Sequence, residues 1–381
     1  LPVEEGNGAL IACMADPAIR IVSLTVTEGG YFIAPDGGGL DLTDPDIRHD
    51  LAHPDAPRTV FGAIVASLTA RRDAGQHPFT VLSCDNLQGN GNITRTAVMT
   101  LARESDAALA DWIDTHGAFP NSMVDCIVPV TGAQELALAH DVGIEDAAPV
   151  THENYRQWVI EDAFCAGRPD WDKVGATFTD NVHLYEAMKI RMLNAGHQVL
   201  ANAGELLSIE TIAGCMADPE VSALFAKVLH EEIAPHVSPV PGMTPAQYID
   251  LISSRFANAK IHDTTRRVAF DGLSRHRGFL HPVIEEALEQ VHPIAGLALV
   301  EALWSRMCAG TREDGCVIEP NDPEWDALQN AALEARTAPK AWLTQYGLLG
   351  QDARFRDAFN AALKTLWDVG TRAALQAYVR G

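Results

Sequence analysis

The pattern of apolar and polar residues divides the chain into a part that alternates strands with helices and a part that is mainly helical. Two apolar runs rich in β-branched residues, 19–26 and 79–84, predict buried strands. Residues 59–72, between them, have helical spacing. Residues 94–113 predict a further helix and 123–128 a third strand. This alternation is typical of a parallel, doubly wound sheet.

From about residue 183 onward, apolar residues recur every three to four positions, which predicts helices. We therefore expect two domains, an α/β domain over residues 1–180 and an all-α domain over residues 181–381. The predicted helices of the second domain are 185–206, 218–233, 245–256, 282–290, 296–308, 323–337 and 355–379.

Polar residues at the ends of the predicted strands are candidates for ligand binding. Glu28 and Asn86 each follow a strand, and ligands of parallel sheets bind beyond the carboxyl ends of the strands. Asn86 could equally be an ordinary turn or helix-cap residue. Asp125 lies inside an apolar run, where a buried carboxylate needs partners, so we favour a functional role.

Composition argues against several classes of binding partner. The chain has 381 residues, 47% of them hydrophobic, and a net charge of −23. Such an acidic surface repels phosphate backbones and anionic lipids, so we expect neither nucleic acid nor a membrane as partner. Its 7 cysteines show no metal-ligand or disulfide spacing, so we expect reduced thiols, a cytoplasmic protein and no metal.

A polar helical face within 185–206 is the strongest candidate for chemistry. On a regular helix its polar residues fall within one arc of about 140°. Such a face suits a pocket for a polyhydroxylated ligand and for proton transfer, although an exposed face stabilised by local ion pairs is the competing interpretation. The residues are Glu186, Lys189, Asn194 and His197.

A glycine-rich phosphate-binding loop is missing from the sequence. No G-x-G-x-x-G run follows a predicted strand, and Gly89-Asn-Gly91 is too short to replace it. We therefore expect the first βαβ unit of a dinucleotide-binding sheet to precede this chain.

Five sequence blocks carry a resemblance to a known family. They are 21–31, 83–91, 119–125, 156–162 and Lys189-x4-Asn194-x2-His197. They resemble the long-chain polyol dehydrogenases, the group of mannitol 2-dehydrogenase, fructuronate reductase and arabinitol dehydrogenase, and occur in the family's order from about residue 15 to at least residue 280. The resemblance implies a partial Rossmann-type domain, a helical substrate domain, NAD or NADP as cofactor, and no metal.

The resemblance also implies the catalytic roles. Lys189 would be the general acid/base, which requires that burial or a neighbouring charge lower the pKa of its amine. Asn86 and Asn194 would donate amide hydrogen bonds to the oxygen that becomes an alkoxide. His197 would orient the substrate and the lysine.

Further implied roles concern the proton path and binding. Glu28 and Glu186 would relay the proton to solvent. The polyol would be bound by Asp125, Arg267 and Arg275, and the cofactor side by Thr25, Glu28 and Asn86.

Some positions leave alternatives open. From the sequence alone, a surface ion pair with Asp263 is the favoured interpretation of Arg267. Cys126 and Arg275 stand where the family commonly has arginine and lysine, so the substrate is uncertain, and an arginine suits a carboxylate. His276 and His281 are expected at the surface.

The predicted activity is an oxidoreductase that interconverts a polyol and its ketose by hydride transfer to NAD(P), with D-mannitol and D-fructose as the favoured pair. A hexuronate such as fructuronate, or a pentitol, is the alternative within the family. A catalytically silent binding protein of the same fold is the alternative outside it. We expect a monomer or a weak oligomer.

Overall fold

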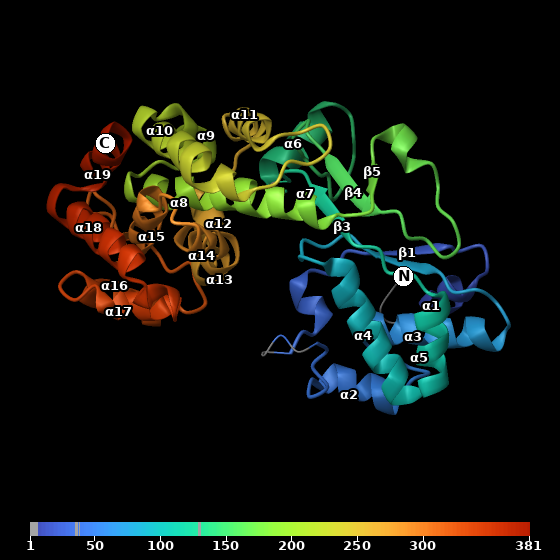
Figure 1. The fold of residues 1–381 in the computed structure, drawn as a ribbon. Coiled ribbons are helices and arrows are strands. Elements are labelled where there is room, and N and C mark those ends of the chain that lie inside the picture. The colour runs from blue at the N-terminus through green and yellow to red at the C-terminus, as the bar shows by residue number, and fades with distance from the viewer. Residues whose placement is uncertain (1–6, 35–36, 38, 129–130) are drawn as a thin grey trace. The chain divides into compact units, whose positions relative to one another are not determined.

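The computed structural model describes residues 7–34, 37, 39–128 and 131–381 (Figure 1), apart from the side chains of Glu28 and Gln134. The chain forms two compact units. The first comprises Leu1–Cys126 and Arg156–Glu186, and the second Ile127–Tyr155 and Ala187–Gly381. None of the described helices is both long and apolar enough to cross a membrane.

The strands of the first unit form two small sheets. β1 (Ile21–Leu24) and β2 (Thr80–Ser83) pair in parallel, as the two apolar runs predicted. β3 (Ser122–Asp125) pairs antiparallel with β4 (Gln157–Glu161), which runs parallel to β5 (Thr177–Thr179). The hydrophobic pattern did not predict β4 and β5, because both are short and border polar residues.

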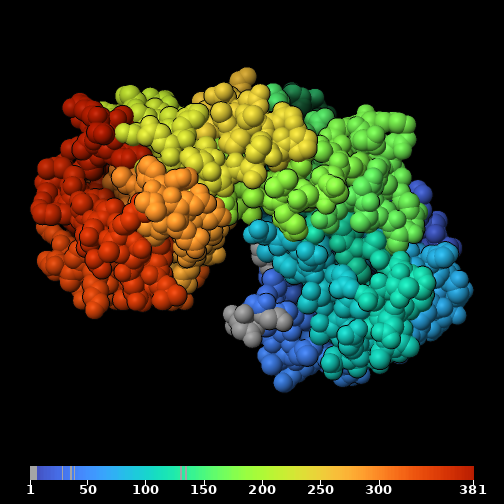
Figure 2. Space-filling view, viewed as in Figure 1, coloured from blue at the N-terminus to red at the C-terminus, as the bar shows by residue number. Residues whose placement is uncertain are grey.

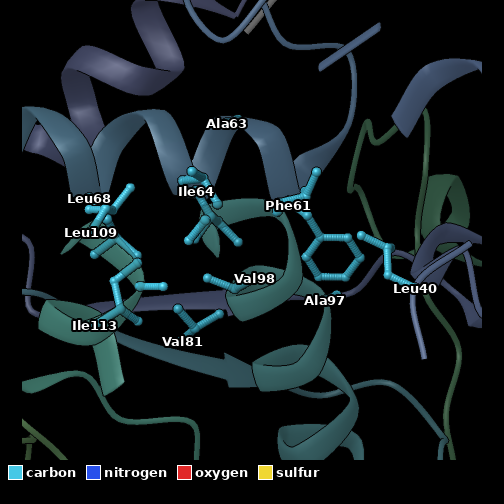
Figure 3. Close-up of a cluster of buried hydrophobic side chains, with 14 of the residues drawn as sticks. Leu40, Phe61, Ala63, Ile64, Leu68, Val81, Ala97, Val98, Leu109 and Ile113 are labelled. Carbon is cyan, nitrogen blue, oxygen red and sulfur yellow. The ribbon is translucent and has the colours of Figure 1, made fainter. Parts of the chain in front are cut away.

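Helices pack on the strands of this unit around one hydrophobic core. Phe61, Ile64 and Leu68 of α3 lie beside Val81 of β2 and Val98 of α4 (Figure 3). Burial of these apolar side chains is the main stabilising contribution to the unit. The helices are α1 (Gly8–Ala15), α2 (Pro45–Ala52), α3 (Val60–Asp73), α4 (Asn90–Ser105) and α5 (Ala107–His116).

The single helix predicted over 94–113 is wrong, because the chain breaks at Asp106. The backbone of Asp106 is extended, and its carboxylate accepts a hydrogen bond from Ala108 N at 2.9 Å. Aspartate favours such N-cap positions over helix interiors. Periodicity continues across the break and therefore does not reveal it.

The second unit is helical, as predicted. Its α8 (Ala195–Leu206) is almost completely buried and packs on α15 (Ala295–Cys308), which packs on α18 (Ala353–Val369). Gly370, at φ +84°, separates α18 from α19 (Thr371–Arg380), so the helix predicted over 355–379 is two helices. In Figure 2 the residues of α16 to α19, coloured orange-red to red, gather into one contiguous mass.

Shorter helices complete the second unit, and several of them were not predicted because their apolar pattern covers less than two turns. They are α6 (Ala133–Asp141), α9 (Ile212–Ala217), α10 (Pro219–Lys227), α11 (Pro245–Phe256), α12 (Thr265–Ala269), α13 (Gly272–Phe279), α14 (His281–Glu289), α16 (Trp325–Ala335) and α17 (Lys340–Leu343).

The segment 127–155, which precedes β4, is tied to the second unit by a buried ion pair. Arg255 of α11 donates to Glu153 from Nε at 3.0 Å and from Nη2 at 2.7 Å. Both side chains are only 4% exposed, so each charge depends on the other. The pair joins the end of this segment to α11, and the whole segment, including α6, belongs to the second compact unit.

A π-helical segment, Lys189–Asn194, connects α7 (His183–Met188) to α8. Its backbone bonds run from i to i+5, so a residue advances by less than the 100° of a regular helix. The arc of 140° calculated for a regular helix therefore does not describe the side chains from Glu186 to His197. Single π turns inside helices are frequent at functional sites.

Candidate active site

Asp85 joins the loops that follow β1 and β2. Its carboxylate accepts hydrogen bonds from Val26 N at 3.0 Å, from Thr27 N at 2.9 Å and from the Tyr31 hydroxyl at 2.7 Å. Burial raises the pKa of Tyr31, so the hydroxyl keeps its proton and donates. Asp85 therefore sets the course of the loop in which Thr25 lies exposed to solvent.

Asn90 holds the loop after β2 against β3. Its Nδ2 donates to the carbonyl oxygens of Asp85, at 3.0 Å, and Ser122, at 2.9 Å, and its Oδ1 accepts from Ser122 N at 2.9 Å. A Cβ on Gly91 would lie 2.5 Å from the backbone of Phe119 and Pro120, so only glycine fits there. Asn86, exposed within this loop, is thus carried by a rigid frame.

Glu186 is buried and connects α7 to the same loop. Its Oε1 accepts from Gly89 N at 2.9 Å, and its Oε2 accepts from His183 Nδ1 at 2.7 Å. The His183 side chain is 48% exposed. The pair therefore links a buried carboxylate to solvent through one imidazole.

Lys189 and Asn194 are the first and last residues of the π-helical segment. The Lys189 side chain is buried, and Asn194 is half-buried. The sequence pattern left an exposed polar face on a regular helix as the competing interpretation of this stretch. Burial of the lysine argues against a solvated face.

His197 lies on α8 and stacks on Phe256 of α11, with 4.1 Å between the ring centroids and 21° between the planes. Its Nε2 lies 3.9 Å from Oδ2 of Asp263. Burial lowers the pKa of His197 to about 4, while Asp263 acts in the opposite direction and Arg267 in the same direction. The imidazole is therefore neutral at pH 7.

Arg267 forms the ion pair with Asp263 that the sequence suggested. Its Nε and Nη2 each donate to one carboxylate oxygen at 2.6 Å, a bidentate arrangement. Asp263 is buried and Arg267 is 44% exposed, so the carboxylate belongs to the interior and not to the surface. Arg275 is half-buried, and its Nη1 donates to Val268 O at 2.9 Å.

The predicted site residues fall into both units. Asp125 ends β3 as a buried carboxylate. The Glu28 side chain lies outside the described part of the chain. The first unit holds Thr25, Glu28, Asn86, Asp125 and Glu186, and the second holds Lys189, Asn194, His197, Arg267 and Arg275.

Sequence reasoning assigned no role to Asp85 or Asn90, although both lie in the block 83–91. Their positions directly after a buried strand were a usable signal. It also treated Asp263 only as the partner of Arg267, because the proximity of residues 197 and 263 is not visible in the sequence.

The carboxyl ends of β1 and β2 present a candidate binding surface. Thr25 and Asn86 are exposed at these ends of two adjacent parallel strands, where nucleotides bind in such sheets, so they fit the nicotinamide side of a dinucleotide. Among the residues that the structure describes, no group of three His, Cys, Asp or Glu side chains could hold a metal ion.

Comparison with known proteins identifies two family domains in succession along the chain. Residues 3–173 match the mannitol dehydrogenase Rossmann domain, and residues 181–368 match the mannitol dehydrogenase C-terminal domain. A mannitol 2-dehydrogenase of Cereibacter sphaeroides is 52% identical over 382 residues, which cover 100% of this chain and 80% of the relative. A D-mannonate oxidoreductase of Escherichia coli is 39% identical over 384 residues, which cover 99% of this chain and 79% of the relative.

A solved structure has the same fold. The ternary complex of Pseudomonas fluorescens mannitol 2-dehydrogenase with NAD and D-mannitol superposes with a TM-score of 0.85 at 38% identity. The match covers 99% of this chain and 78% of that one. The predicted fold class, a Rossmann-type domain followed by a mainly helical domain, is thereby confirmed. The resemblance inferred from the five sequence blocks is also confirmed, and the chain belongs to the mannitol dehydrogenase family.

Proposed function

We propose that this protein interconverts D-mannitol and D-fructose by hydride transfer with NAD. Membership of the family makes it an NAD-dependent oxidoreductase that acts on CH–OH groups. The identity of 52% to a mannitol 2-dehydrogenase supports the choice of substrate, and the relative bound to NAD and D-mannitol supports the cofactor. The observation that carries the proposal is the buried Lys189 at the start of a π-helical segment.

Lys189 accepts the hydroxyl proton of the polyol while the alcohol carbon becomes the carbonyl carbon of the ketose. NAD, when bound, supplies the acceptor for the hydride. Asn86 and Asn194 donate amide hydrogen bonds to the oxygen as negative charge develops on it, which lowers the barrier more than it stabilises the bound alcohol. His197, neutral at pH 7, orients the reacting hydroxyl without adding a second positive charge.

The proton leaves Lys189 through Glu186. The carboxylate of Glu186 is hydrogen-bonded to His183, whose half-exposed ring exchanges protons with water. Glu28 would serve the same path from the strand end. The polyol chain is held by Asp125, Arg267 and Arg275, and the nicotinamide side by Thr25, Glu28 and Asn86. We place the domain division between residues 180 and 181.

The lysine variant tests this mechanism. Replacing Lys189 with alanine should lower kcat for mannitol oxidation by about 10²-fold or more, because general-base catalysis is lost. NADH fluorescence titration serves as the control and should give the same affinity in both proteins. Activity within about threefold of the parent would remove Lys189 from this role.

A hexuronate is the second candidate substrate. The E. coli relative named D-mannonate oxidoreductase is 39% identical, and Arg275 carries a planar guanidinium that suits a carboxylate. The ratio of kcat/KM for fructuronate to that for fructose separates the candidates. A ratio above one that falls in the Arg275→Lys variant would favour the hexuronate, and a ratio below one would favour fructose.

A catalytically silent protein of the same fold is the third possibility. Absence of NADH binding up to millimolar concentration would favour it. Three further properties stay predictions: a preference for NAD over NADP, a cytoplasmic location, and a monomeric or weakly oligomeric state. Titrating the protein with both cofactors tests the preference for NAD.

A further inference from the structure

Asp263 is a buried carboxylate placed between two side chains of the candidate substrate site. We propose that Asp263 is a positioning residue: it holds His197 as the Nε2–H tautomer and fixes the guanidinium of Arg267, so that both present defined groups to the polyol. The expected effect of Asp263 on catalysis rests on the proposed function, whereas its expected effect on the tautomer of His197 does not.

The backbone presents Asp263 rigidly. Its carbonyl oxygen accepts a hydrogen bond from Ile212 N at 2.9 Å, and its N–H donates to Ile261 O at 3.0 Å. Thr264, the next residue, caps α12 by accepting from Arg267 N at 3.2 Å. The carboxylate of Asp263 is therefore held just before the first turn of α12 and is aligned with Arg267 one turn later.

The surroundings of His197 select its tautomer. The stacked ring of Phe256 sets the plane of the imidazole, and Nε2 is buried without a hydrogen-bond partner, 3.9 Å from Asp263 Oδ2. A neutral imidazole keeps its proton on the nitrogen that faces a carboxylate. Nδ1 is then the nitrogen with the lone pair, and it can accept a hydrogen bond from a substrate hydroxyl.

The separation of 3.9 Å is about 1 Å longer than a hydrogen bond. At this separation the carboxylate acts on the imidazole through its negative charge, which favours the proton on the nitrogen that faces it.

Arg267 benefits from the same carboxylate. Its Nε and Nη2 are used by Asp263, which leaves Nη1 to bind a substrate hydroxyl in a fixed direction. A carboxylate this deeply buried would be costly without a partner, and the bidentate guanidinium provides it. Asp263 therefore orients one acceptor, on His197, and one donor, on Arg267.

Activity of the full chain tests the catalytic consequence. Asp263→Asn should lower kcat/KM for mannitol by about 10- to 100-fold, as is usual when an orienting partner is removed. In the His197→Ala background the same change should cost at least about fivefold less, because the residue it orients is gone. Asp263→Glu, which keeps the charge, should recover part of the loss.

Glu205→Gln is the matched control. Glu205 is also a buried carboxylate, lies on the same helix as His197 and accepts from Arg312 Nη2 at 2.7 Å, but it is outside the candidate site. It should change kcat/KM by less than about threefold. An equal loss from Asp263→Asn and Glu205→Gln, or an equal loss in both His197 backgrounds, would reduce Asp263 to a structural residue and overturn the proposal.

The tautomer can be measured without turnover. In protein labelled with ¹⁵N-histidine, the His197 signals, identified by their loss in His197→Ala, should show protonated Nε2 in the parent protein and a shift toward the other tautomer in Asp263→Asn. Protonated Nδ1 in the parent would overturn the proposal even if every variant lost activity. A parent with protonated Nε2 that does not oxidise polyols would contradict the proposed function alone.

Discussion

The loops of the first unit and the His197–Asp263 cluster of the second hold their candidate site residues by different means. In the first, backbone groups are bonded to Asp85 and Asn90, so the course of the main chain itself depends on them. In the second, a ring stack joins His197 of α8 to Phe256 of α11, and a local ion pair holds Asp263 to Arg267 of α12. We therefore expect substitutions in the first region to lower stability at any pH, and substitutions in the second to change the chemistry and the pH dependence of stability.

The largest expected effect on stability distinguishes two glycines. Gly91→Ala would place a Cβ 2.5 Å from backbone atoms of residues 119 and 120, so we expect a loss of about 3 kcal/mol in the free energy of unfolding. Gly278→Ala, in the helix α13 of the second unit, meets nothing within 4 Å and should be neutral or slightly stabilising. Urea unfolding of both variants measures this difference, and an equal loss in the free energy of unfolding would contradict the expected contrast between the two regions.

The pH dependence of His197 is the next largest effect. Its pKa is about 4 in the folded protein, against the ordinary histidine value of 6.5 in the unfolded chain, so the unfolded chain binds the proton more readily. The stabilising contribution is complete above pH 6.5 and is lost as the pH falls toward 4, by up to about 3 kcal/mol. Unfolding measured from about pH 7 to pH 4 should show a shallower decline in His197→Gln, and parallel curves would contradict the burial of the neutral imidazole.

The smallest expected effect comes from Asn90. Asn90→Ala leaves the buried Ser122 N and three carbonyl oxygens without this partner, and we expect a loss of about 2 kcal/mol. Asn92→Ala, on the exposed side of the same helix α4, is the control and should change stability by less than about 0.5 kcal/mol. If the Asn90 variant keeps full stability but loses activity, the assignment of structural roles to the first region is wrong.

The burial of two histidines is a feature that the sequence pattern did not predict. The expectation that His276 and His281 lie at the surface is wrong, since both are buried. His276 stacks on Trp304 at 4.3 Å, lies 3.0 Å from Glu301 and accepts from Asn202 Nδ2 at 3.0 Å. The neighbours of His276 in the sequence are polar and charged, so they predict exposure. The buried carboxylate of Glu301 lies more than twenty residues away, and no local pattern reveals it.

The amino-acid sequence by itself determined the parallel pairing of the first two strands, the helical character of the second unit and the family. These follow from apolar periodicity and from contiguous blocks, which are properties of neighbouring residues. Only the tertiary structure decided that Lys189–Asn194 is a π-helical segment, that 127–155 joins the second unit and that Asp263 faces His197. The last two depend on contacts between residues far apart in the chain, whose energies no local pattern records, and the first is a change of backbone hydrogen bonding that apolar periodicity does not reveal.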